Sequence, residues 1–159
     1  MIIKELKDED FVNYKKPSMF IAFPSCTFKC ERECGQKMCQ NSELVKAPDI
    51  NINVTDLVNR YLSNPITSSV VCGGLEPMDS FEDLWRFIFH LRQKGCNDNV
   101  IIYTGYYKNE IPEEHLRRLT LVPNIIVKWG RFIPNQQPHY DEILGVKLVS
   151  SNQYAEVIS

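Results

Sequence analysis

The chain has 159 residues with 18 basic and 20 acidic side chains, and its net charge of −2 excludes the concentrated basic surface of a nucleic-acid-binding protein. A chain of this length can bury about two thirds of its unfolded surface and fold as one domain without disulfides. No stretch approaches the roughly 18 apolar residues of a membrane span, and the charged first residues lack the apolar core of a secretory signal. We therefore expect a cytoplasmic protein that binds neither membranes nor nucleic acid.

A short apolar segment followed by closely spaced cysteines is the first informative feature in chain order. Residues 19–23 are apolar throughout and predict a buried strand. The loop after this strand contains four cysteines: Cys26, Cys30, Cys34 and Cys39. Because a reducing cytosol disfavours disulfides, cysteines at this density indicate metal ligands or redox groups.

A helix and a second strand follow the cysteine loop. Residues 55–62 have apolar side chains at helical spacing, and residues 68–72 are rich in β-forming side chains. The strand breaks at Gly73 and Gly74. Two residues without Cβ atoms allow a sharp turn and a close approach of the backbone to a ligand.

The clearest predicted helix begins after Ser80. Ser80 and Asp83 have the spacing of a capping box, and Gly95 is placed to end the helix. Apolar and aromatic side chains repeat at helical spacing between residues 81 and 91. An amphipathic helix that crosses over a sheet needs such a stripe, so we interpret it as core.

The second half of the chain repeats the alternation of strand and helix. Strands are predicted at 99–104, 124–128 and 146–149, with a helix from Pro112 to Arg118 and a loop over 130–144. Strands separated by helices imply right-handed βαβ units around a mainly parallel sheet. Because there are too few units for a closed eight-stranded barrel, the predicted fold class is α/β, a single-domain open or partial (βα) barrel.

Four stretches follow predicted strands and should meet at one edge of the sheet, where α/β proteins bind ligands. They are the cysteine run at 26–39 and the stretches 72–77, 103–106 and 150–153. We therefore expect one composite site.

The cysteine spacing combined with a glycine-rich turn resembles a known superfamily. Cys26-x3-Cys30 with a further close cysteine, followed by Gly-Gly-Leu-Glu-Pro at 73–77, is similar to the radical S-adenosylmethionine (radical SAM) enzymes. The resemblance implies a [4Fe-4S] cluster held by three cysteines, which leaves one iron free to bind S-adenosylmethionine. An electron delivered through the cluster then cleaves a carbon–sulfur bond and gives a 5′-deoxyadenosyl radical. No catalytic side chain beyond the cluster and the S-adenosylmethionine site is expected.

The third cluster ligand is either Cys34 or Cys39. The common pattern of the superfamily is C-x3-C-x2-C, but position 33 here is glutamate. Cys34 would give C-x3-C-x3-C, whereas Cys39 would make residues 31–38 an enlarged loop. We prefer Cys39, because in activators of ribonucleotide reductase the third cysteine typically precedes one residue and then asparagine, as in Cys39-Gln-Asn41.

The stretches Tyr-Thr-Gly-Tyr at 103–106 and Ser-Ser-Asn-Gln at 150–153 are also similar to anaerobic ribonucleotide reductase activating proteins. One departure is Trp129, which stands directly before a glycine where many activators have aspartate. The resemblance implies one domain over 1–159, with an N-terminal extension at 1–17 and a cluster-binding loop at 24–48. The implied cofactor-binding residues are Met38, Gly73, Gly74, Leu75, Glu76, Pro77, Thr104, Ser151 and Asn152.

The function implied by this resemblance is a glycyl-radical activase. Its partners would be the catalytic subunit of an anaerobic ribonucleotide reductase and a flavodoxin- or ferredoxin-type electron donor, and it could form a homodimer. Two alternatives stay open: a small radical SAM enzyme acting on a peptide or metabolite, and a non-enzymatic zinc module. The cysteine gaps lack the paired C-x2-C knuckles of most structural zinc sites, which disfavours the zinc module.

Overall fold

A six-stranded sheet with helices on one face forms the body of the protein. The computed structural model describes residues 1–159, and the order of its central strands is β10-β7-β6-β5-β3-β2. The four inner strands run parallel and are β3 (Ser18–Phe23), β5 (Ser69–Gly74), β6 (Asn99–Tyr103) and β7 (Ile125–Trp129). The two edge strands, β2 (Glu5–Asp10) and β10 (Tyr154–Val157), run antiparallel to their neighbours.

The fold confirms the α/β class but not a mainly parallel sheet, since both edges make the sheet mixed. The partial barrel stays a prediction. Neither edge strand was predicted: β2 carries the charged sequence ELKDED, and β10 is four residues long. Charged and short strands suit sheet edges because they discourage pairing with other chains, but they lack the apolar pattern by which strands are recognised.

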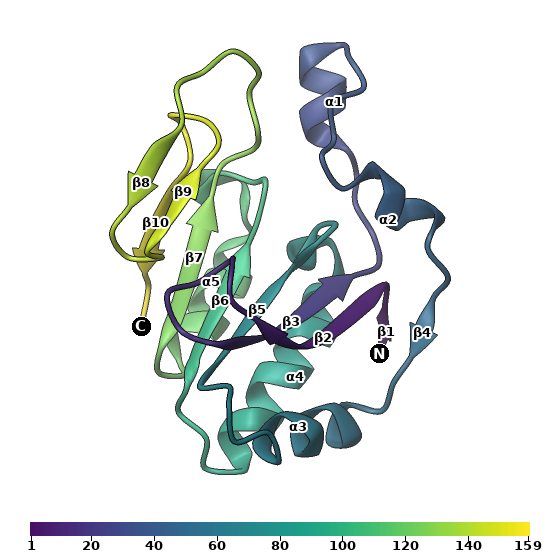
Figure 1. The fold of residues 1–159 in the computed structure, drawn as a ribbon, viewed down its shortest axis with the longest axis vertical. Coiled ribbons are helices and arrows are strands. Elements are labelled where there is room, and N and C mark those ends of the chain that lie inside the picture. The colour runs from purple at the N-terminus through teal and green to yellow at the C-terminus, as the bar shows by residue number, and fades with distance from the viewer.

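Three helices cover one face of the sheet (Figure 1). They are α3 (Val54–Leu62), α4 (Phe81–Gln93) and α5 (Glu113–Thr120). Their buried side chains pack with Met19, Ile21, Val70, Cys72 and other strand residues in the larger core cluster. The aromatic stripe predicted as core is confirmed, because Phe81 and Phe87 both lie in this cluster. None of the helices is long and apolar enough to cross a membrane.

The capping box predicted at the start of α4 does not form. The Ser80 side chain makes no cap hydrogen bond, because the 3₁₀ turn η1 (Pro77–Ser80) leads directly into the helix. Instead, the Ser80 hydroxyl lies 2.8 Å from the hydroxyl of Ser25, in the segment that leads to the cysteines.

The opposite face of the sheet is covered by a smaller apolar cluster and a hairpin. The hairpin pairs β8 (His139–Asp141) with β9 (Val146–Leu148), so the segment predicted as a loop over 130–144 contains a strand. It also means that β9, predicted as the last strand of the main sheet, lies outside that sheet. Alternate strand residues such as Val71 and Ile101 pack here.

The cysteine loop extends beyond the carboxyl edge of the sheet. It contains two short helices, α1 (Lys29–Cys34) and α2 (Ser42–Lys46), neither of which buries a side chain. In Figure 1, α1 stands above the sheet, across from the segment that joins β7 to the hairpin. The chain returns to the body through β4 (Ile50–Asn51), which pairs with β1 (Ile2–Ile3).

The glycine that ends β5 gives a direct test of the packing between β5 and β3. A Cβ added to Gly74 would lie 2.6 Å from Ala22 Cβ, and Gly74 has φ 82°. Gly95→Ala is the matched control, because Gly95 has φ 79° but open space around the added atom. We expect the control to lower the free energy of unfolding by about 1 kcal/mol and Gly74→Ala to lower it by about 2 kcal/mol more. Equal losses in urea unfolding would show that contact with Ala22 is unimportant.

Candidate iron–sulfur and ligand site

A cavity of about 530 Å³ lies at the carboxyl edge of the sheet, where the predicted stretches were expected to meet. Its wall is built from the cysteine loop, the ends of β5, β6 and β7, and parts of β2, β3 and the β8–β9 hairpin. Most of the predicted site residues line it: Cys26, Cys30, Met38, Cys39, Gly73, Gly74, Leu75, Glu76 and Thr104. Residues far apart in the sequence therefore share one chamber.

The remaining predicted residues do not line this cavity. Pro77 is buried as the first residue of η1, and Ser151 donates a hydrogen bond to Gln136. Asn152 donates from its amide to the hydroxyl of Tyr107 and to the carbonyl of Arg131, at 3.0 and 2.8 Å. Ser151 and Asn152 therefore form hydrogen bonds with the loop after β7, and this loop lies next to the cavity.

The four cysteines of the loop differ in whether they reach the cavity. Cys26, Cys30 and Cys39 line the cavity, whereas Cys34 does not. Burial raises the pKa of the Cys26 thiol to about 12, and the charges of Glu76 and Asp79 add to this effect. Burial also raises the pKa of Cys30, with Cys39 as the next contributor. All three cavity-lining thiols are free of disulfides.

These thiols fit a cluster better than a single ion. No three His, Cys, Asp or Glu side chains come close enough together to hold one metal ion. A cubane does not require this, because each of its cysteines binds a different iron. The donor set, three soft sulfur ligands at the wall of one cavity, fits a [4Fe-4S] cluster. The raised thiol pKa values mean that cluster binding would release protons.

The glycine turn is fastened to the segment after Cys39. The Asn41 amide donates to the Gly74 carbonyl at 2.7 Å. This contact links the end of β5 to the loop two residues beyond Cys39. A carbonyl oxygen has two lone pairs, so the Gly74 oxygen can still accept a hydrogen bond from a ligand.

Glu76 anchors the turn from within the protein. Its carboxylate accepts hydrogen bonds from the Met78 amide, the Thr104 hydroxyl and the Gly105 amide, at 3.1, 2.8 and 2.8 Å. Burial raises the pKa of this carboxyl from 4.5 to about 7, although the three donors oppose the shift. Glu76 therefore joins the ends of β5 and β6.

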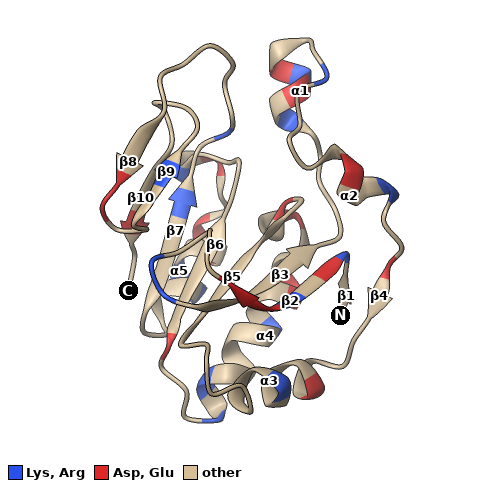
Figure 2. Cartoon of the chain, in the orientation of Figure 1, with Lys and Arg blue, Asp and Glu red and all other residues tan.

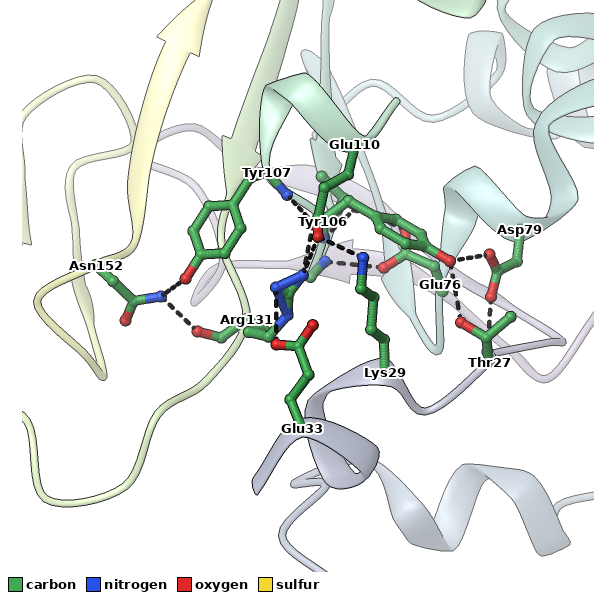
Figure 3. Close-up of polar contacts among 12 residues, drawn as sticks. Thr27, Lys29, Glu33, Glu76, Asp79, Tyr106, Tyr107, Glu110, Arg131 and Asn152 are labelled. Atoms are coloured by element: carbon green, nitrogen blue, oxygen red, sulfur yellow. Dashed lines mark hydrogen bonds and ion pairs between the residues drawn. The ribbon is translucent and has the colours of Figure 1, made fainter. Parts of the chain in front are cut away.

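Asp79 fastens the beginning of the cysteine loop, as Figure 3 shows. It accepts hydrogen bonds from the Thr27 amide at 2.7 Å and from the Tyr106 hydroxyl at 2.6 Å. The hydroxyls of Thr27 and Tyr106 also lie 3.0 Å apart. The residue after Cys26 is thus held by groups from two other strand ends.

Trp129, which stands where many activators have aspartate, has a structural role at the end of β7. Trp129 is fully buried in the larger core cluster and donates from its ring nitrogen to Glu156, so its side chain points away from the cavity. The adjacent Lys128 points the other way and lines the cavity. Burial lowers the pKa of Lys128 to about 8, and its ammonium donates to the Gly130 carbonyl at 2.6 Å.

The sequence did not indicate three charged residues of the site. Lys128 and Arg131 line the cavity, and Glu110 lies beside it and pairs with Arg131. The burial of Arg131 follows from no local pattern, because its partner Glu110 lies on another segment. The ammonium of Lys128 donates to the Gly130 carbonyl, two residues further on. The positions of Lys128 and Arg131 next to the predicted strand end were the only available signal.

The mixed sheet, the cysteine loop at its carboxyl edge and the three cavity-lining thiols define an iron–sulfur protein. A family model described as 4Fe-4S single cluster domain matches residues 18–154, which is most of the chain. The chain belongs to this family, and its cofactor is a [4Fe-4S] cluster. The family is consistent with a radical SAM-type protein. No curated protein gives a significant match.

Glu76 predicts a measurable pH dependence. Because its pKa is raised on folding, the native state binds more protons than the unfolded state between about pH 4.5 and 7. Its contribution to the free energy of unfolding therefore falls as the pH rises through this window and is constant above it. In urea unfolding, the stability of the wild type relative to Glu76→Gln should decline by no more than about 3 kcal/mol across the window. A difference that does not vary with pH would refute the buried position of this carboxyl.

Proposed function

We propose that this protein is a radical SAM activase that generates a glycyl radical on an anaerobic ribonucleotide reductase. The observation that carries the proposal is the shared cavity, because it brings Cys26, Cys30 and Cys39 together with the Gly73–Gly74 turn. Membership of a [4Fe-4S] family supports the cluster. The Tyr-Thr-Gly-Tyr and Ser-Ser-Asn-Gln stretches support this particular branch of the superfamily.

The cavity has a suitable size and chemistry for S-adenosylmethionine. Its volume of about 530 Å³ lies within the range of about 300–1,000 Å³ that is usual for small-molecule sites. The backbone at Gly73 and Gly74 would receive the amino group of the methionine moiety, and the Gly74 carbonyl retains a free lone pair for this contact. Met38 and Leu75 supply apolar wall for the adenine.

The protein's own residues would mainly bind, orient and exclude water. Glu76 is buried and is held by hydrogen bonds from Met78, Thr104 and Gly105, so it keeps the glycine turn in place. When bound, the cluster and S-adenosylmethionine would supply a one-electron reductive cleavage of a carbon–sulfur bond, with the electron coming from a flavodoxin- or ferredoxin-type donor, and hydrogen abstraction from a backbone glycine of the reductase would follow.

The cavity also has apolar wall that suits an incoming polypeptide loop. This wall is formed by Val12, Phe20, Tyr103 and Leu148. Val12 is 72% exposed, so this wall reaches the surface of the protein. A glycine-containing loop of the reductase could enter there and reach the reacting group.

The ligand assignment predicts opposite results for two cysteine variants. Cys39→Ala should lose at least about 100-fold of S-adenosylmethionine cleavage after anaerobic cluster reconstitution, because it removes a thiolate that fixes the cluster. Cys34→Ala should retain activity, since Cys34 lies outside the cavity lining. Retained activity in Cys39→Ala together with its loss in Cys34→Ala would reverse the assignment.

The substrate class is tested with the partner reductase. The reduced, cluster-loaded protein mixed with S-adenosylmethionine and an anaerobic ribonucleotide reductase should produce the electron paramagnetic resonance doublet of a glycyl radical. A reductase whose radical-site glycine is replaced by alanine is the control. Cleavage of S-adenosylmethionine without any glycyl radical would instead favour a small radical SAM enzyme that acts on a peptide or metabolite.

A further inference from the structure

The helix that carries Cys30 buries no side chain in the core of the protein. None of the residues of α1 is buried, and α2, further along the same loop, buries none either. A six-residue helix is too short to be stable in water by itself. Polar contacts must therefore determine where α1 lies.

Four alternating charges join α1 to the segments that follow β6 and β7, as Figure 3 shows. Lys29 pairs with Glu110, and Glu110 accepts from the Arg131 guanidinium at 2.7 and 2.5 Å. Arg131 also pairs with Glu33 at 3.2 Å. The series begins and ends on α1, and we call it the four-charge clasp.

The spacing of the two α1 residues suits this clasp. Lys29 and Glu33 are four positions apart, so they lie on the same face of the helix, with Cys30 next to Lys29. Their partners come from two separate segments, Glu110 after β6 and Arg131 after β7. Figure 2 shows the charges of both signs that α1 carries.

Glu110 and Arg131, the inner pair of the clasp, are well placed to hold Lys29 and Glu33, the outer pair. The Arg131 side chain is only 5% exposed and the Glu110 side chain 20%. The guanidinium lies 4.6 Å from the centre of the Tyr107 ring, and the Tyr107 amide donates to Glu110 at 2.8 Å. Because the pair is shielded and fixed on its own side, its attraction for Lys29 and Glu33 is screened less than that of a surface pair.

We propose that Glu110 and Arg131 are positioning residues that hold α1, and with it Cys30, at the cavity before any cluster is bound. The clasp would preorganise the thiols, so that cluster binding does not have to order the loop. This inference does not rest on the proposed radical chemistry, because it concerns the protein without cofactors.

A charge exchange within α1 tests the clasp. In the double variant Lys29→Glu with Glu33→Lys, each charge faces a like charge, while the net charge is unchanged. The exchange also places the acid at the start and the base at the end of α1, which favours the isolated helix. Faster amide hydrogen exchange in α1 of the metal-free protein would therefore come from the lost clasp. We expect an increase of about tenfold.

The matched control is Glu43→Lys with Lys46→Glu in α2. These residues form an exposed pair with each other in the same loop. The control should leave exchange in residues 29–34 within about twofold of the wild type. If the α1 variant does the same, α1 is held by something other than the clasp.

Salt distinguishes an electrostatic clasp from a general loss of structure. In the wild type, raising the ionic strength weakens attraction and should speed exchange in α1, whereas in the exchanged variant it weakens repulsion and should slow exchange. A change of the same sign in both proteins would contradict the proposal. A chelator should also remove the reconstituted cluster several-fold faster from the exchanged variant than from the wild type or the α2 control, and equal rates would show that the clasp does not serve the cluster.

Discussion

The parallel pairing of β3 with β5 is the constraint on which the site depends. The register runs from Met19 opposite Val70 to Phe23 opposite Gly74, so the two strands end side by side. The cysteine loop leaves one of these ends and the glycine turn leaves the other. Only glycine fits at position 74, because its backbone lies against Ala22 at a positive φ. The cysteine loop and the glycine turn, almost fifty residues apart in the sequence, therefore meet because of strand pairing alone.

The cysteine loop is held by polar groups rather than by a hydrophobic core. Asp79 fixes the segment after Cys26, the four-charge clasp fixes the helix that carries Cys30, and Asn41 fixes the segment after Cys39. Each cavity-lining cysteine thus has an attachment nearby, whereas Cys34, at the end of α1, does not line the cavity. Polar attachments leave the loop open to solvent on its outer side. In the proposed function, in which the cluster receives electrons from a donor protein, this exposure would give the donor access.

The sequence was sufficient to predict the inner strands, the covering helices and the composite site. Each inner strand has an almost continuous apolar run, and a helical pattern lies between each inner strand and the next, so their parallel arrangement follows from general rules. The edge strands and β8 were missed because their sequences are short or charged. The strand β9 was predicted, but it pairs with β8 and lies outside the main sheet. The charged residues of the wall were missed for a different reason: the burial of Arg131 depends on Glu110, twenty-one residues away, and no local pattern reports such a pair.

The central claim is that three cysteines hold a [4Fe-4S] cluster whose remaining iron binds S-adenosylmethionine. The most direct measurement is electron paramagnetic resonance of the anaerobically reconstituted and reduced protein, recorded before and after S-adenosylmethionine is added. The account predicts the spectrum of a reduced [4Fe-4S] cluster whose g values shift on addition, because the ligand binds the iron itself. A spectrum that S-adenosylmethionine leaves unchanged, from a protein with a full complement of iron, would contradict the account.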